Sequence, residues 1–239
     1  DVAKFDSKIT TGAWRAPYTN FLAFAEQSFF DELAELMETD RIQLRLDLLE
    51  NVKGTTDDRI QYSPQRMQQV IRTAVEKSGW GSAPDGVYQG FSAYYCHNSH
   101  VAEVADVVIE GGRPVVKRVV CVVDCGIVVN PLGARNQVEG GVIDGIGHAM
   151  YGDFAFTGGA PENLNFDGYR LIRMKEIPRV ETHFIKNTES PTGLGEPALP
   201  PAGAAVANAI KAATGKRLYN QPFLKELKDL QIPAKEIIG

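Results

Sequence analysis

One carboxylate stands in the most distinctive loop of the sequence. Glu196 lies in the segment Gly193-Leu-Gly-Glu-Pro-Ala-Leu-Pro-Pro201, where two glycines precede it and three prolines follow it. Glycine lets the backbone approach a ligand closely, whereas proline fixes φ and restricts the residue before it. A carboxylate held in this way is suited to general-base catalysis, which requires reach and a suitable pKa, and an apolar pocket would raise that pKa. The plain alternative is a carboxylate that caps the following helix or faces solvent.

The other reactive side chains give weaker signals. Cys96, Cys121 and Cys125 lack the paired spacing of zinc or redox sites and are too few for an iron–sulfur cluster, so buried thiols are favoured. His97 and His100 lie three residues apart, but their neighbours indicate a strand or loop. A structural role is therefore expected for both histidines, and no metal site is predicted.

Neither the glycines nor the charge balance indicates a nucleotide or nucleic-acid site. Gly193-x-Gly195-x-x-Ala198 matches the letters of a dinucleotide fingerprint, but no hydrophobic strand precedes it, which disfavours a nicotinamide-dependent oxidoreductase. The 239 residues include 25 basic and 30 acidic side chains, a formal net charge of −5 that gives no reason to expect nucleic acid or an anionic membrane as partner.

Helical spacing dominates the first third of the chain. Apolar residues recur at helical intervals over residues 20–37, with Asn20 as the expected N-cap, and a short helix is expected after Thr39-Asp40. Ser63 and Pro64 predict the start of a third helix that ends at Gly79.

The pattern changes after residue 84. Strands over 101–109 and 115–123, joined by Glu110-Gly-Gly-Arg113, predict a hairpin, and 180–184 predicts a further strand. An Ala-rich helix is expected over 202–213, and 218–239 is expected to form a charged terminal arm. This order favours an α+β fold, divided into a helical part (1–84) and an α+β part (85–239).

A helix over residues 138–150 carries four glycines: Gly140, Gly141, Gly145 and Gly147. Each glycine costs a helix interior about 0.5–1 kcal/mol, so four of them indicate close approach of another element or of a ligand. The pattern alone does not choose between helix packing and ligand approach.

Several blocks together resemble the molybdenum-binding subunit of the xanthine dehydrogenase/aldehyde oxidase family, especially the beta subunit of isoquinoline 1-oxidoreductase-type enzymes. They occur in the family's order and cover most of the chain. The blocks are Thr11-Gly-Ala-Trp-Arg-Ala-Pro17, Phe29-Phe-Asp-Glu-Leu-Ala34, Val123-Asp-Cys-Gly126 with Asn130-Pro131, Gln137-Val-Glu-Gly-Gly141, Gly193-Leu-Gly-Glu-Pro197, and Ala207-Asn-Ala-Ile210 with Ala213-Thr-Gly-Lys-Arg217.

The resemblance implies a molybdopterin cofactor, in the cytosine dinucleotide form used by bacterial members. It implies that Glu196 matches the catalytic glutamate and that Arg15 matches an arginine near the metal centre, acting in substrate orientation or loop support. Gln137 matches a residue near the pterin, while Gly140, Gly141 and Gly195 would let the cofactor approach the backbone.

The implied reaction is oxidative hydroxylation of an N-heteroaromatic or aldehyde substrate. The glutamate takes a proton from the attacking oxygen, water supplies the inserted oxygen, and electrons leave through [2Fe–2S] clusters on a small partner subunit. The resemblance implies a bacterial location, periplasmic or cytoplasmic, with the periplasm favoured.

The likeness covers only the C-terminal part of such a subunit, so its N-terminal half is an expected partner. Without that half the chain is expected to hold the cofactor weakly and to expose an apolar surface near residues 14–24, covered by the missing half or by a second copy in a homo-oligomer. Tyr18 stands where many relatives have glycine, and Asp144 where many have an uncharged residue. The alternative function is a non-catalytic assembly module that retains the fold.

Overall fold

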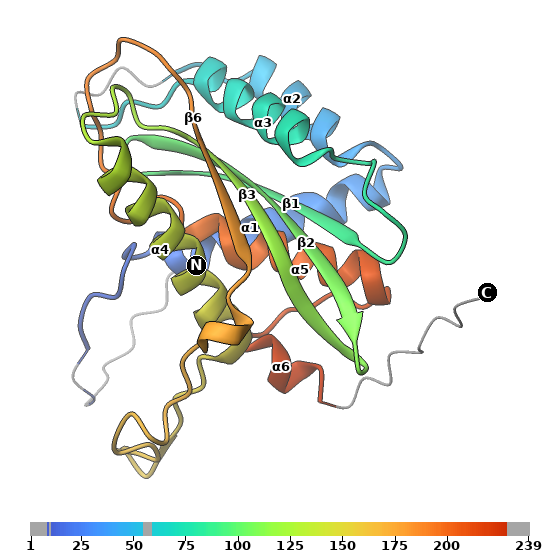
Figure 1. Ribbon diagram of the computed structural model, residues 1–239, viewed down its shortest axis with the longest axis vertical. Helices are drawn as coiled ribbons and strands as arrows, with labels where there is room; N and C mark the ends of the chain where they lie inside the picture. Colours follow the sequence, from blue (N-terminus) through green and yellow to red (C-terminus); the bar gives the residue numbers. More distant parts are fainter. Residues whose placement is uncertain (1–8, 10, 55–58, 229–239) are drawn as a thin grey trace.

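A four-stranded sheet organises the chain. The computed structural model describes residues 9, 11–54 and 59–228. The strands follow the order β1-β2-β3-β6, antiparallel from β1 to β3, with β6 parallel to β3 (Figure 1). Their bounds are β1 (Tyr88–Cys96), β2 (Ser99–Glu110), β3 (Arg113–Asp124) and β6 (Arg179–Phe184).

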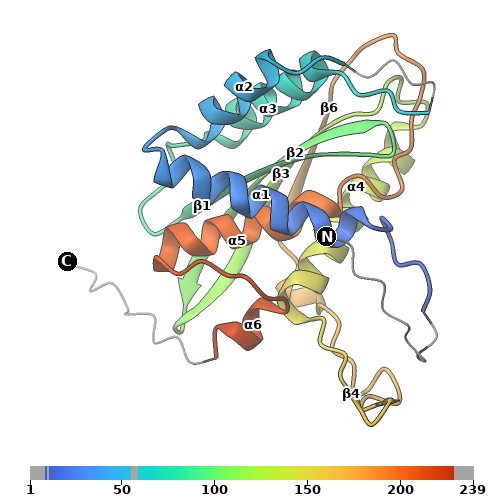
Figure 2. The same cartoon turned by 180° about the vertical axis from the view of Figure 1, so that it is seen from behind.

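Helices cover both faces of this sheet. They are α1 (Thr19–Leu36), α2 (Arg41–Glu50), α3 (Pro64–Ser78), α4 (Pro131–Tyr151) and α5 (Pro200–Thr214). The side chains of β3 alternate between the faces: Val119 and Val123 pack in the core with α4 and α5, whereas Val120 and Val122 pack in the core with α2 and α3. Figure 2 shows α1 beside α5, on the side away from α2 and α3. The expected α+β class is confirmed.

Local capping explains where several helices begin and end. Asp40 Oδ1 accepts hydrogen bonds from the main-chain N–H groups of Ile42 and Gln43 at the start of α2. Ser63 Oγ accepts from the Arg66 N–H at the start of α3, and Gly79 ends that helix with a positive φ of 68°. These boundaries confirm the sequence prediction.

The start of α1 differs from the prediction. The helix begins at Thr19, and Asn20 does not cap it, because the Asn20 amide donates to the main-chain oxygen of Arg15 at 3.0 Å. A tight turn precedes the helix: Thr19 N–H donates to Pro17 O at 2.8 Å across Tyr18, which has φ 64° and ψ −44°. This is the strained γ-turn geometry, in which a residue with a Cβ is unusual.

Strand β1 was not among the predicted strands, although the neighbours of His97 indicated a strand or loop. Polar residues such as Ser92 interrupt its apolar pattern. The prediction of a charged terminal arm is wrong for residues 218–228. Leu218 and Phe223 are fully buried in the core, and Phe223 begins the short helix α6 (Phe223–Glu226). Residues 229–239 lie outside the described part.

Two of the sequence blocks meet in an ion-pair network around the buried carboxylate of Asp31. The Arg217 guanidinium donates to Asn208 Oδ1 at 2.6 Å and to Asp31 Oδ2 at 2.8 Å, and Arg41 approaches the other Asp31 oxygen at 2.8 Å. This network joins α1 to α5 and to the chain beyond it. The division at residue 84 stays a prediction. Helix α1, on one side of that boundary, packs against α5, on the other.

An extended loop projects from the body between α4 and β6. Both views show it reaching away from the sheet, and it carries β4 (Phe156–Thr157), β5 (Ala160–Pro161) and the short helix η1 (Met174–Glu176). Its apolar residues Leu164 and Phe166 are exposed, as are Trp14 and Phe21, while Phe24 is buried. In the described residues no helix is both long and apolar enough to cross a bilayer.

Candidate active site

Glu196 lies on a loop that is fastened to the sheet at several points. After β6, Ile185 N–H donates to Val123 O at 2.9 Å, and Thr192 N–H donates to Cys125 O at 3.0 Å. Ser99 Oγ then donates to Gly193 O at 2.6 Å. The loop that carries the carboxylate is therefore held by the ends of β2 and β3.

Asp124, at the end of β3, supports this loop. Arg66 from α3 donates to both of its carboxylate oxygens, at 2.8 and 2.6 Å, and Asn187 from the loop donates to Oδ1 at 2.7 Å. Burial raises the pKa of Asp124, but the hydrogen bonds from Arg66 and the Gly126 N–H outweigh burial and hold that pKa below its ordinary value. An ionised Asp124 thus ties helix, strand and loop together.

Both oxygens of the Glu196 carboxylate have partners. Ala16 N–H donates to Oε1 at 3.1 Å, and His97 Nε2 lies 2.6 Å from Oε2. Leu199 is the N-cap residue of α5, with no side-chain cap, so the helix-cap alternative for Glu196 is wrong. These immediate partners are polar, and about a third of the Glu196 side chain is exposed.

Arg15 joins two predicted site elements through main-chain oxygens. Its Nε donates to Gly195 O at 2.8 Å, and a second nitrogen, Nη2, also donates to that oxygen. Nη2 further donates to Gln137 O at 3.2 Å. The guanidinium therefore links the loop before Glu196 to helix α4.

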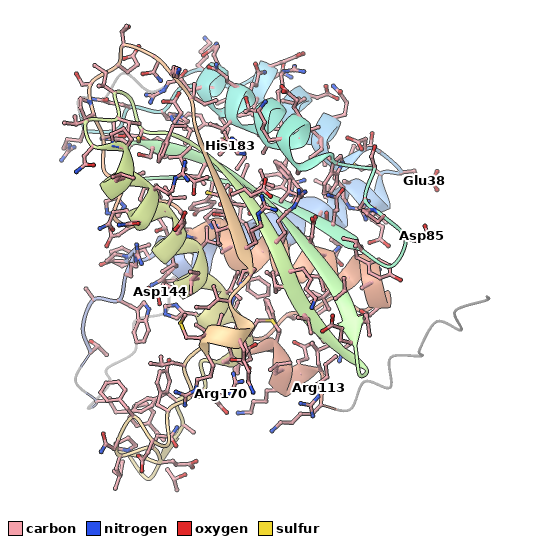
Figure 3. The ribbon with its side chains drawn as sticks, viewed as in Figure 1. Glu38, Asp85, Arg113, Asp144, Arg170 and His183 are labelled. Atoms are coloured by element: carbon pink, nitrogen blue, oxygen red, sulfur yellow. The ribbon has the colours of Figure 1, made fainter. Side chains whose placement is uncertain are left out.

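Asp144 anchors the same N-terminal segment. Its Oδ2 lies 3.4 Å from Arg15 Nη1, and its Oδ1 lies 3.1 Å from His148 Nε2. Trp14 donates its indole N–H to that same His148 nitrogen at 2.7 Å. Figure 3 shows Asp144 on α4, facing the N-terminal segment. The sequence marked Asp144 only as a departure from the family pattern.

The glycines of α4 serve two different purposes. A Cβ on Gly145 would lie 2.6 Å from Leu199 O, and one on Gly141 would lie 3.1 Å from the Ala198 Cβ, so both permit close packing against the start of α5. A Cβ on Gly140 would meet Arg15 Nη1 at 3.7 Å, which is ordinary contact. Gly140 therefore faces the site, whereas Gly141 faces the core.

An open hollow of about 550 Å³ lies in front of these groups. Gln137 and Gly195 border it together, since a Cβ on Gly195 would be 3.7 Å from Gln137 Oε1. Four of the six predicted site residues, Arg15, Gln137, Gly195 and Glu196, line this hollow, while Gly140 lies beside Arg15 and Gly141 faces the core. The residues that line the hollow are Arg15, His97, Gln137, Gly193, Leu194, Gly195 and Glu196.

His97 belongs to this site, although a structural role was expected. It lies in the two-residue turn between β1 and β2, where it and Asn98 both have positive φ. His100 is instead buried, accepts a hydrogen bond from Ser63 N–H at 3.1 Å, and has a pKa lowered to about 4, chiefly by burial. Within the described residues no cluster of three or more potential ligands could hold a metal ion.

A family model and several known proteins are similar to this chain. The family described as "Molybdopterin cofactor-binding domain" matches residues 25–178. The beta subunit of isoquinoline 1-oxidoreductase from Brevundimonas diminuta is 29% identical over 214 residues, which cover 87% of this chain and 26% of that protein. A nicotinate dehydrogenase subunit from Pseudomonas putida is 31% identical over 217 residues, which cover 85% of this chain and 18% of that protein.

A further relative carries a different cofactor in its name. A membrane-bound aldehyde dehydrogenase (pyrroloquinoline-quinone) from Gluconacetobacter polyoxogenes is 30% identical over 222 residues, covering 88% of this chain and 29% of that protein. Among solved structures, the aldehyde oxidoreductase from Desulfovibrio gigas has a TM-score of 0.65 at 16% identity and covers 90% of this chain and 42% of that one. This likeness supports the fold. The chain spans less than a third of the length of these three sequence relatives.

Proposed function

Because the chain belongs to the molybdopterin cofactor-binding domain family, we propose that it forms the catalytic-glutamate part of a molybdenum hydroxylase. Its substrate class is N-heteroaromatic compounds or aldehydes, the classes named for the relatives. The observation that carries the proposal is the convergence of Glu196, Arg15 and Gln137 on one open hollow.

The residues around the hollow fit a polar cofactor. The Gln137 amide borders the hollow and has no hydrogen bond within the described part of the chain, so it is free to bind polar ring atoms. Gly195 adds no side chain there, so a cofactor could approach the backbone of the loop, and Gly140 on α4 lies beside Arg15, which lines the hollow. When bound, the molybdenum cofactor supplies the two-electron redox chemistry and the transferred oxygen.

Glu196 is proposed as the general base of the reaction. It accepts at a carboxylate oxygen the proton of the oxygen that attacks the substrate carbon. The hydrogen bond from Ala16 and the contact with His97 fix the orientation of that carboxylate. Proton transfer by a positioned side chain requires this kind of fixed reach.

Arg15 is proposed as a positioning residue. Its guanidinium is engaged by main-chain oxygens of Gly195 and Gln137 and by the carboxylate of Asp144, which favours loop support over substrate orientation. Through Gly195 it acts on the residue next to Glu196. The sequence alone did not choose between these two roles for Arg15.

The finer features of the proposal concern the complete enzyme. We propose the cytosine dinucleotide form of molybdopterin, oxygen derived from water, and electron transfer to [2Fe–2S] clusters on a partner subunit. We propose that the N-terminal half of a molybdenum subunit covers the exposed residues Trp14, Tyr18 and Phe21. A periplasmic site of action stays a prediction.

Two analyses of the complete enzyme test this proposal. Metal and extracted-cofactor analysis should give molybdenum with a pterin, and product formed in ¹⁸O-labelled water should carry the label. Pyrroloquinoline quinone without molybdenum, or label from dioxygen only, would contradict it. A folded subunit that binds its partners but holds neither molybdenum nor pterin would favour the alternative of an assembly module.

A further inference from the structure

The turn between β1 and β2 presents an imidazole to the proposed base. His97 Nε2 lies 2.6 Å from Glu196 Oε2, and Gly193 N–H donates to His97 O at 3.2 Å. A Cβ on Gly193 would lie only 2.9 Å from the His97 Cβ, so the two backbones are in close contact. The turn and the loop are therefore held together on both sides of the carboxylate.

The second ring nitrogen of His97 has a partner that can fix its tautomer. Cys96 Sγ lies 2.9 Å from His97 Nδ1, and Thr19 Oγ1 lies 3.3 Å from the same sulfur. Burial raises the pKa of the Cys96 thiol, and the negative charge of Glu196 raises it further, so the thiol keeps its proton. A thiol S–H that donates to Nδ1 leaves the imidazole proton on Nε2, where it points to the Glu196 carboxylate.

We propose that His97 is a positioning residue of the proposed reaction, in which Cys96 fixes its tautomer and Nε2–H holds Glu196 Oε2. This inference rests on the proposed function. Ala16 N–H holds Oε1, so the two donors together fix the plane of the carboxylate. The ring also fills the space beside Oε2, which orients the carboxylate toward the hollow that both residues line.

Three variants separate this role from a general effect on the turn. His97→Asn keeps a residue that tolerates positive φ but is too short to hold Oε2. His97→Gln restores a longer side chain with an N–H donor. Asn98→Gly is the matched control, since it alters the same turn without touching Glu196, and glycine suits its φ of 59°.

The first readout needs no cofactor. Imidazole ¹⁵N chemical shifts of this chain at neutral pH should show His97 with its proton on Nε2 and an unprotonated Nδ1. In Cys96→Ala the proton should be distributed over both nitrogens. A wild-type His97 protonated on Nδ1, or a tautomer unaffected by Cys96→Ala, would overturn the proposed arrangement.

The second readout is kinetic, on complete enzyme with matched molybdenum content. His97→Asn should lower kcat by about tenfold or more with little change in KM, because a misplaced catalytic group costs rate at a fixed binding energy. His97→Gln should recover part of the loss, and Asn98→Gly should stay within about twofold of wild type. If Glu196→Gln abolishes turnover while His97→Asn does not change it, the role of His97 is refuted and the proposed function stands. If Glu196→Gln itself has no effect, the proposed function fails and this inference fails with it.

Discussion

Arg15 donates hydrogen bonds to the main-chain oxygen of Gly195, the residue before Glu196, across a separation of 180 residues in the sequence. The same guanidinium reaches Gln137 O on α4. One side chain thus places the loop of the proposed base against the helix that borders the hollow.

Removing this link should loosen the loop. Hydrogen bonds that involve a charged group contribute about 1.5–3 kcal/mol, so we expect Arg15→Ala to lower the free energy of unfolding by about 1–2 kcal/mol after allowance for exposure. Arg15→Lys should not restore it, because an ammonium group cannot reproduce the planar fork. Urea unfolding of the chain measures both, with Arg135→Ala, an exposed arginine on α4, as control. Equal stability of wild type and Arg15→Lys would show that the fork geometry is unimportant.

Two glycines of α4 should respond to alanine in opposite directions. A Cβ on Gly145 would lie 2.6 Å from Leu199 O and 2.9 Å from the Ala202 Cβ, so Gly145→Ala should destabilise the chain by about 1–3 kcal/mol. A Cβ on Gly140 would meet only Arg15 Nη1 at 3.7 Å, an ordinary contact, so Gly140→Ala should stabilise the helix by about 0.5–1 kcal/mol.

Gly140 and Gly145 also separate the two explanations for the glycines of α4, which are helix packing and close approach of the cofactor. In the complete enzyme, Gly140→Ala should reduce bound molybdopterin despite the gain in stability of the chain. Cofactor content is measured by extraction and compared at equal protein concentration. Full cofactor content in Gly140→Ala would remove Gly140 from the proposed site.

Glu103 should make stability depend on pH. It is fully buried on β2, where Cys121 Sγ lies 3.3 Å from Oε1, and burial raises its pKa to about 8. An unfolded glutamate titrates near 4.3, so between that pH and about 8 the folded chain binds one more proton than the unfolded chain. The free energy of unfolding therefore falls as pH rises through this window, by about 1.4 kcal/mol per pH unit.

Glu103→Gln should remove this contribution. Urea unfolding at pH 5.5 and 7.5 should show that the variant gains about 2–3 kcal/mol relative to wild type over that interval. Other titrating groups, including His100, are shared by both proteins and cancel in the difference. Identical pH dependence of the two proteins would mean that Glu103 is not a neutral buried acid at pH 5.5–7.5.

Local signals in the sequence predicted much of the fold. Ser63, Pro64 and Gly79 define α3 because capping, a fixed φ and a left-handed C-cap act over a few residues. The Gly-Gly turn at 111–112 likewise defines the β2–β3 hairpin. Strand β1 was missed because it packs under α5 with small and polar residues, so it lacks the alternating apolar pattern.

The candidate site was predictable only where residue type carries chemistry. Glu196 stood out because glycines and prolines frame it, and the resemblance added Arg15 and Gln137. His97 could not be found in this way, since its contact with Glu196 depends on a turn and a loop that lie far apart in the sequence. The only sign of the tight turn in the sequence was the pair His97-Asn98, which stands between two segments rich in aromatic or β-branched residues.

The most direct measurement of the central claim is the reductive half-reaction of Glu196→Gln. The substitution keeps the size of the side chain and an acceptor for Ala16 N–H, so the fold and cofactor content should survive. Wild type, Glu196→Gln and the control Glu189→Gln, an exposed carboxylate of the same loop, are compared at equal molybdenum content under anaerobic conditions. General-base catalysis contributes about 10²–10⁴-fold, so substrate-dependent reduction in Glu196→Gln should slow at least a hundredfold while the control stays near wild type. A loss below tenfold in Glu196→Gln at equal molybdenum content would contradict the assignment of Glu196 as the base.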